Sequence, residues 1–247
     1  MIIDRVQHPG WLVNSWLVAG REDGRALVID TGADAAKVLE MVRRHSARVQ
    51  AIVCTHRHYD HIAGNEFIAR NLGVPIFAHK LERAFVPGVT DVVEDGQRFQ
   101  VGRWEAEFLH IPGHTAGQLG VHVPGVGVWT GDTLFKGSVG GTMGSGATGF
   151  SDLQASVQRL LQLPDDLKIY PGHGEPTQVG TEKDRNPFVR MWNGRDQAGT
   201  RPARVEGKRV TIEVWGTDYD RGHKAQVRFN DSRVEIVGGS KVQKVTL

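Results

Sequence analysis

The sequence predicts an α/β domain followed by a small all-β appendage. Over the first 194 residues, short apolar runs that end in turn residues alternate with segments whose apolar residues recur at helical spacing. Residues 195–247 instead show only short alternating patterns separated by turn signals. The length of 247 residues allows one large domain with such an appendage. We therefore expect a catalytic domain at residues 1–194 and a β-rich appendage at residues 195–247.

The elements of the domain follow from these two kinds of pattern. Strands are predicted at residues 11–19, 26–29, 49–54, 74–78, 104–111, 119–123, 126–130 and 168–170. Helices are predicted at residues 34–45, 65–72 and 151–163, with Asp34 and Ser151 as the expected N-caps. The glycine-rich stretch at residues 137–149 predicts a long loop.

The most specific feature is the segment Thr-His-Arg-His-Tyr-Asp-His at residues 55–61, directly after a predicted strand. It holds four side chains of metal-binding type, His56, His58, Asp60 and His61. Imidazole and carboxylate are the ligands that zinc, iron and manganese take in hydrolytic sites. His56 and His58 alternate, so on an extended segment they point the same way and can share one metal. Asp60 and His61 come a turn later and can reach a second metal.

Three further candidate ligands stand at the ends of other apolar runs. They are His114 in Ile-Pro-Gly-His-Thr, Asp132 in Trp-Thr-Gly-Asp-Thr and His173 in Tyr-Pro-Gly-His-Gly. In layered α/β folds, loops just past strand ends are where sites are built, because rigid elements hold them. A carboxylate such as that of Asp132 can bridge two cations with its two oxygens. The set predicts a binuclear centre that makes a hydroxide nucleophile at neutral pH.

The appendage reads as four or five strands. Alternating patterns lie at residues 209–215, 224–229, 233–237 and 241–245, with hairpin turns at 230–232 and 238–239. It holds 11 Lys and Arg against 7 Asp and Glu, a net charge of +4, and the rest of the chain carries −2. Because its aromatic content is low and its charge excess modest, we expect packing or homodimer formation rather than nucleic-acid binding.

The composition limits the partners, the metal ligands and the cellular location that we expect for this protein. The whole chain carries a net charge of only +2, which gives no strong attraction to nucleic acid or membrane surfaces. Its one cysteine, Cys54, excludes a disulfide framework and a thiolate-based metal site, and it is expected to be a buried apolar residue. No signal peptide and no apolar run of membrane-spanning length is evident. A cytoplasmic protein with a small-molecule substrate is therefore expected.

In their order along the chain, His-x-His-x-Asp-His, Pro-Gly-His-Thr, Gly-Asp-Thr-Leu-Phe and Pro-Gly-His-Gly resemble the metallo-β-lactamase superfamily. The branch they resemble most is that of the glyoxalase II-like, or hydroxyacylglutathione hydrolase-like, thioester hydrolases. The resemblance covers about residues 1–193. It implies an αββα sandwich with the site at one edge. It also implies two divalent metal ions, for which zinc is expected and iron or manganese are alternatives.

The resemblance also implies roles for individual residues. Metal 1 would take His56, His58 and His114, metal 2 would take Asp60, His61 and His173, and Asp132 would bridge the two. A metal-bound hydroxide would attack the carbonyl group of a thioester or ester, with Asp60, His61 and Asp132 as the catalytic residues.

Supporting roles are implied beside the ligands. Asp30 in Asp-Thr-Gly matches the family's first motif, in which the aspartate supports the ligands from behind. Thr115 and Thr133 each follow a candidate ligand and are expected to hydrogen-bond to it.

Related activities remain as alternatives, since proteins of this fold share the ligands. Asp132 argues against a true β-lactamase, whereas a mononuclear iron persulfide dioxygenase and a lactonase remain open. The segment that holds glutathione in the authentic enzymes is replaced here by the glycine-rich stretch, and their helical C-terminal domain by the appendage. The sequence therefore assigns no substrate-binding residue, although Lys136, Arg185 and Arg190 are candidate contacts for an anionic substrate.

Overall fold

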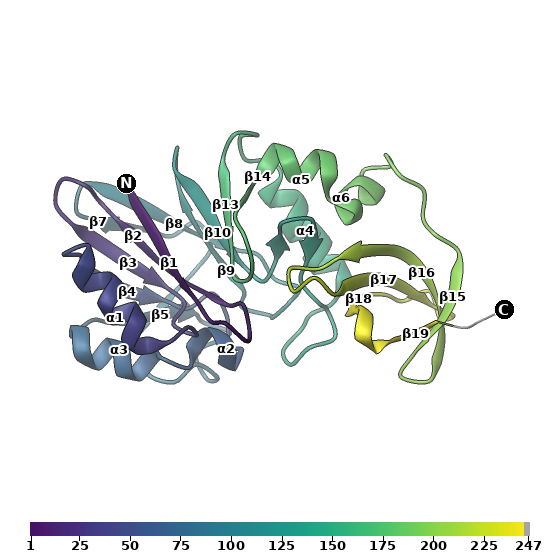
Figure 1. The fold of residues 1–247 in the computed structure, drawn as a ribbon, viewed down its shortest axis with the longest axis horizontal. Coiled ribbons are helices and arrows are strands. Elements are labelled where there is room, and N and C mark those ends of the chain that lie inside the picture. Colours follow the sequence, from purple (N-terminus) through teal and green to yellow (C-terminus); the bar gives the residue numbers. More distant parts are fainter. Residues whose placement is uncertain (245–247) are drawn as a thin grey trace.

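The computed structural model describes residues 1–244 and is built around two six-stranded sheets (Figure 1). The first sheet contains, in spatial order, β1 (Ile2–Gln7), β2 (Asn14–Ala19), β3 (Arg25–Ile29), β4 (Arg48–Val53), β5 (Ile76–His79) and β6 (Asp91–Val93). The second contains β14 (Thr177–Gln178), β13 (Lys168–Pro171), β10 (Gly127–Gly131), β9 (Leu119–Val123), β8 (Trp104–His110) and β7 (Arg98–Val101).

Helices cover the outer face of each sheet. On the first sheet lie α1 (Ala35–Arg44) and α3 (Asn65–Leu72), and on the second lie α4 (Phe150–Leu160), α5 (Val179–Arg185) and α6 (Pro187–Trp192). Val38 and Ile68 share a core with Leu17, whereas Leu153 shares another with Val128. The order of layers is helix, sheet, sheet, helix, so the predicted αββα sandwich is confirmed.

Residue alternation explains why the strands read as continuous apolar runs. Trp16 and Val18 pack between the two sheets, and Leu17 points to the helices on the other face. When both faces of a strand are buried, the side chains on both faces are apolar, and the sequence shows a continuous apolar run. Because β3, β4 and β5 pair in parallel, their carboxyl ends lie at the same edge of the sheet, where the following loops meet.

The C-terminal part forms a separate five-stranded antiparallel sheet, as predicted. Its strands, in spatial order, are β18 (Val234–Gly238), β17 (His223–Phe229), β16 (Lys208–Thr217), β15 (Arg201–Val205) and β19 (Val242–Lys244). Val227 and Phe229 belong to the core of this sheet, but Val214 and Ile236 join the core beneath α4 and α6. The sheet therefore packs against the sandwich, and the division of the chain at residue 194 stays a prediction.

Several boundaries differ from the sequence-based ones. The strand predicted at 11–19 begins only at Asn14, since the chain turns before it through Leu12 at a positive φ of 56°. Helix α4 has Gly149 rather than Ser151 at its N-cap, because the loop enters it with a φ of 109° that favours glycine. Part of the strand predicted at 241–245 lies outside the described residues. Among residues 1–244, no helix has the length and apolar character needed to cross a bilayer.

Candidate metal centre

The histidine-rich loop leaves β4 and turns into the short helix α2 (Tyr59–Ile62). It is held against the loop after β3, where the backbone N–H of Thr31 donates to the carbonyl oxygen of His61 at 2.8 Å. Gly32 permits this approach, because a Cβ there would lie 1.3 Å from the carbonyl oxygen of Asp60. The Asp-Thr-Gly segment thus has a steric reason to contain glycine.

The first group of candidate ligands brings together three histidine rings. Nδ1 of His58 lies 3.0 Å from Nε2 of His56 and 2.9 Å from Nε2 of His114. His114 reaches this point from the loop after β8, more than fifty residues along the chain. One nitrogen of each ring thus faces the same small space.

The second group consists of Asp60, His61 and His173. Nε2 of His61 lies 3.2 Å from Nε2 of His173, which follows β13. Oδ2 of Asp60 lies 3.3 Å from Nε2 of His173 and 3.9 Å from Nε2 of His61. Two nitrogens and one carboxylate oxygen therefore converge beside the first group.

Asp132, which follows β10, lies between the two groups. Its Oδ1 is 3.3 Å from Nε2 of His61, and its Oδ2 is 3.4 Å from Nε2 of His173 and 3.5 Å from Nε2 of His114. Oδ1 is buried and has no hydrogen-bond partner among the described residues. A Cβ at position 172 would lie 2.4 Å from Oδ1, so the Pro-Gly-His segment needs its glycine to let Asp132 in.

The outer nitrogens of the rings show which way the inner ones point. Four rings meet an acceptor on the outside: Nε2 of His58 at Ser145 O (3.0 Å), Nδ1 of His114 at Gly141 O (2.8 Å), Nδ1 of His173 at Trp11 O (2.9 Å) and Nδ1 of His61 at Asp30 Oδ2 (2.8 Å). A carbonyl or carboxylate only accepts, so each outer nitrogen must carry the hydrogen. A neutral imidazole has one N–H, which leaves a lone pair on the inner nitrogen.

Lone pairs that face one another at about 3 Å repel unless a proton or a cation lies between them. When the rings are neutral, the inner nitrogens and Oδ1 of Asp132 form such a set, with outer partners that orient the rings as in known metal sites. The residues present therefore fit one or two divalent cations of the kind that take nitrogen and oxygen ligands.

The electrostatics of the cluster differ between its two halves. Burial lowers the pKa of His114 to about 4, so this ring is neutral at pH 7, as a metal ligand must be. Burial also opposes protonation of His173, but the Asp132 and Asp60 carboxylates together outweigh it and raise the pKa of His173 to about 9. Burial likewise opposes ionisation of Asp132, yet the His173 and His61 rings hold the pKa of Asp132 well below its usual range.

Metal affinity is expected to depend on pH because of His173. With its pKa raised to about 9, this ring is protonated at neutral pH without a cation, so a cation must displace the proton. Because each zinc ion that binds must displace one proton from His173, the affinity for zinc should fall about tenfold for every pH unit below that pKa. Competition with a chromophoric chelator between about pH 6 and 8 measures this. An affinity that stays constant over that range would contradict a protonated His173 in the metal-free protein.

The predicted supporting residues behave differently from one another. The Asp30 carboxylate accepts from His61 and from both the backbone N–H and the hydroxyl of Thr55, each at 2.8 Å. Thr115 and Thr133 do not make the predicted bonds to ligands. The hydroxyl of Thr133 donates to Ile111 O at 3.3 Å, and that of Thr115 has no partner among residues 1–244. Both threonines are buried in the loop packing, and neither hydroxyl bonds to the neighbouring ligand.

A buried ion pair behind the histidine loop could not be identified from the sequence. Glu82 is fully buried, and its Oε2 accepts from Nε of Arg57 at 2.5 Å. Its Oε1 accepts from the backbone N–H of Gly117 at 2.7 Å. One carboxylate thus joins the loop of His56 and His58 to the loop of His114. The arginine between the two histidines was the available signal, since it needs a partner.

The C-terminal sheet also reaches the cluster, which the sequence did not indicate. The ring of Tyr219 stacks on His173 with centroids 4.5 Å apart and an interplanar angle of 17°.

The basic residues predicted to contact an anionic substrate lie away from the cluster. Lys136 and Arg185 line a cavity that none of the candidate ligands borders, and Arg190 pairs with Asp196 at 2.6 Å. Cys54 is buried as expected, and burial raises the pKa of its thiol.

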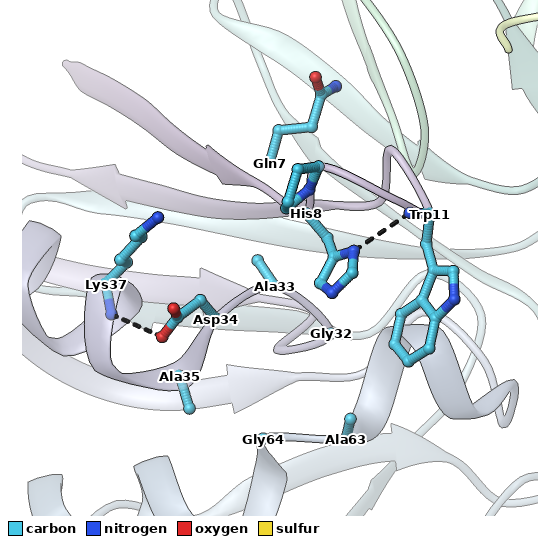
Figure 2. Close-up of a pocket in the computed structure, with 11 residues that line it drawn as sticks. Gln7, His8, Trp11, Gly32, Ala33, Asp34, Ala35, Lys37, Ala63 and Gly64 are labelled. Atoms are coloured by element: carbon cyan, nitrogen blue, oxygen red, sulfur yellow. Dashed lines mark hydrogen bonds between the residues drawn. The ribbon is translucent and has the colours of Figure 1, made fainter.

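A cavity of about 420 Å³ is lined in part by the loop that joins β1 and β2 (Figure 2). His8 and Trp11 border it on one side, with their rings stacked at 4.5 Å, and Gly32 and Gly64 border it on the other. None of the seven candidate ligands is among the residues that line it. Its connection to the cluster is indirect, through the Trp11 carbonyl that orients His173.

Comparison with known proteins identifies the family. The model of the metallo-beta-lactamase superfamily matches residues 8–173. A hydroxyacylglutathione hydrolase of Brucella anthropi is 37% identical over 142 residues, which are 57% of this chain and 53% of that protein. A hydroxyacylglutathione hydrolase of Gloeobacter violaceus is 34% identical over 62% of this chain and 60% of its own length. The chain thus spans little more than half of the length of these relatives.

Solved structures agree with this assignment. The structure described as TTHA1623 in a di-iron-bound form is 32% identical, with a TM-score of 0.66, and the match covers 75% of this chain and 99% of that one. ETHE1 from Myxococcus xanthus is 25% identical, with a TM-score of 0.70 over 76% of this chain and 84% of its own. Fold, motifs and family model agree, and the chain belongs to the metallo-β-lactamase superfamily.

Proposed function

We propose that this protein is a hydrolase that uses two divalent metal ions to cleave thioesters or related esters, as glyoxalase II-like enzymes do. The observation that carries the proposal is the position of Asp132 between two groups of three donors. One carboxylate that faces both groups suits a pair of neighbouring cations better than a single one. The relatives named hydroxyacylglutathione hydrolase support the substrate class.

The cations, when bound, would lower the pKa of water to near neutrality and stabilise the negative charge that develops on the carbonyl oxygen. The protein orients the candidate ligands and buries four of the seven, His56, His61, Asp132 and His173. Side-chain exposure is 31% for Asp60 but 10% for Asp132, so Asp60 is the carboxylate that a water molecule or substrate can reach. Asp60 is therefore placed to accept a hydrogen bond from the attacking water and orient it.

Thiol release from S-D-lactoylglutathione by purified, metal-analysed protein tests this function. We expect saturable release that needs about two metals per chain and is lost on chelation. A protein that retains both metals and releases no thiol from this or other thioesters would contradict the proposal. Cytoplasmic location and homodimer formation remain predictions.

A second candidate is a mononuclear iron dioxygenase that acts on a persulfide. The observation that favours it is the group of Asp60, His61 and His173, because two histidines and one carboxylate with open positions suit iron(II) oxygenases. Metal analysis separates the two functions. One iron per chain together with oxygen uptake would favour the dioxygenase over the hydrolase.

A further inference from the structure

A cavity of about 190 Å³ lies between the metal centre and the C-terminal sheet. His114 and Asp132 border it from the centre, and Tyr219, Lys224 and Lys241 border it from the sheet. At roughly 30 Å³ for each water, it has room for about six water molecules. That is enough for a short acyl group but not for a whole thiol carrier, which would have to extend outside.

The sheet is fixed in this position by specific contacts. The backbone N–H of Thr142 donates to Ile236 O at 3.0 Å, and that of Ile236 donates back to the Thr142 hydroxyl at 2.8 Å. The Thr142 hydroxyl in turn donates to Glu235 at 2.5 Å. Thr142 belongs to the glycine-rich loop, so the sheet and that loop form one wall of the cavity together.

A second anchor holds the turn that carries Tyr219. The Ser138 hydroxyl donates to Asp218 at 2.8 Å, and Asp218 pairs with Lys224 at 2.9 Å. Gly174 permits the close approach of Tyr219, because a Cβ at position 174 would lie 3.0 Å from Cβ of Tyr219. These contacts fix the turn, and the Tyr219 ring stacks on the ring of His173.

The two lysines that line the cavity from the sheet, Lys224 and Lys241, differ in whether they form an ion pair. Lys224 is buried and its charge is balanced by Asp218. Lys241, at the end of the 3₁₀ turn η1 (Gly239–Lys241), is exposed and forms no ion pair within residues 1–244. The wall thus presents one free ammonium group, among the described residues, at the edge of a cavity that leads to the candidate ligands.

We propose that the C-terminal sheet is the substrate-recognition wall of the active site. The cavity holds a short acyl group, and Lys241 binds a negative charge on the thiol carrier, a carboxylate or a phosphate. The inference rests on the proposed thioester hydrolysis and adds the substrate class to it. It assigns a function to a sheet that lies outside the residues matched by the family model, 8–173.

Three lactoyl thioesters test the proposal: those of glutathione, which carries carboxylates, of coenzyme A, which carries phosphates, and of N-acetylcysteamine, which is neutral. Lys241→Ala should raise KM about three- to tenfold for whichever charged thioester the protein prefers, since an exposed ion pair of this kind is worth roughly 1 kcal/mol. Lys241→Glu should raise it further. Neither change should alter kcat or the KM for the neutral thioester, because the acyl group is the same.

Lys244→Ala is the matched control. Lys244 is an exposed lysine of the same sheet, but its ammonium lies over the Trp215 ring, 4.3 Å from the centroid, and it does not line the cavity. We expect no change in any of the three KM values. Equal effects of the two lysine variants, or equal losses on charged and neutral thioesters, would overturn the role of Lys241 alone. Failure of the metal-loaded parent protein to hydrolyse any of the three would overturn the proposed function as well.

Discussion

Asp132→Ala is expected to abolish thioester hydrolysis and to lower the metal content in the same preparation. Both carboxylate oxygens face candidate ligands, with Oδ1 3.3 Å from His61 and Oδ2 3.4 Å from His173. Without them, two cations would lie side by side with no anion between them. We expect a fall in kcat/KM of about 10³-fold or more, with metal falling from about two to one or fewer per chain. Thiol release and elemental analysis of the same sample measure both.

Two further variants make this experiment specific. Asp132→Asn keeps the volume of the side chain and one carbonyl oxygen, so we expect it to fold normally and retain at most one metal firmly. Asp165→Ala serves as a control, because Asp165 is exposed and pairs with Lys183, and within residues 1–244 its side chain makes no hydrogen bond or ion pair with a candidate ligand. Activity that survived Asp132→Ala with full metal occupancy would show that Asp132 is not a ligand that both cations need.

Asp30→Ala is expected to damage stability and metal binding together. Its buried carboxylate accepts three hydrogen bonds, from His61 and twice from Thr55, so the change leaves the ring N–H of His61 and the backbone N–H of Thr55 unpaired, whereas the Thr55 hydroxyl keeps its contact with Nδ1 of His56 at 3.0 Å. Each such donor costs about 1 to 3 kcal/mol. Asp30 also has a φ of 56°, a left-handed conformation that alanine disfavours by about 1 kcal/mol. We expect the free energy of unfolding to fall by several kcal/mol, as measured by urea denaturation.

The effect on metal binding follows from the freed His61 ring. Loss of its outer acceptor should weaken zinc binding about 10- to 100-fold. Asp30→Asn tolerates the same backbone conformation and should show the metal defect with a smaller loss of stability. Asp34→Ala is the control: Asp34 caps α1 at the surface, so we expect a loss of about 1 kcal/mol and unchanged zinc affinity. Unchanged zinc affinity in Asp30→Ala would mean that this carboxylate does not orient His61.

The fold was predictable where local pattern and burial agree. The runs around Leu17 and Val28 are apolar on both faces of a buried sheet, and the histidine loop follows β4 directly. The short elements α5 and β6 were missed, because few buried residues mark them. The convergence of His56, His114 and His173 was inferred from motif order, since no local pattern states which strand ends adjoin.

The parts of the site that escaped prediction depend on contacts between distant segments. Tyr219 meets His173 because a separate sheet packs against the sandwich, and its neighbours in sequence give no sign of this. Glu82 is buried by an arginine and a backbone N–H from two other loops. Thr115 and Thr133 were assigned to their neighbours along the chain, whereas adjacency in sequence does not bring a hydroxyl within bonding distance of the preceding ring or carboxylate.

Backbone carbonyls orient three of the histidines, so the centre should tolerate substitutions at these acceptor positions but not changes in loop length. The acceptors are main-chain oxygens at Trp11, Gly141 and Ser145, which every amino acid provides. Related sequences can therefore differ at these positions and keep the same hydrogen bonds. Insertions or deletions within the loops would displace the oxygens themselves. At these three acceptor positions, loop length rather than residue identity is thus what natural variation must preserve.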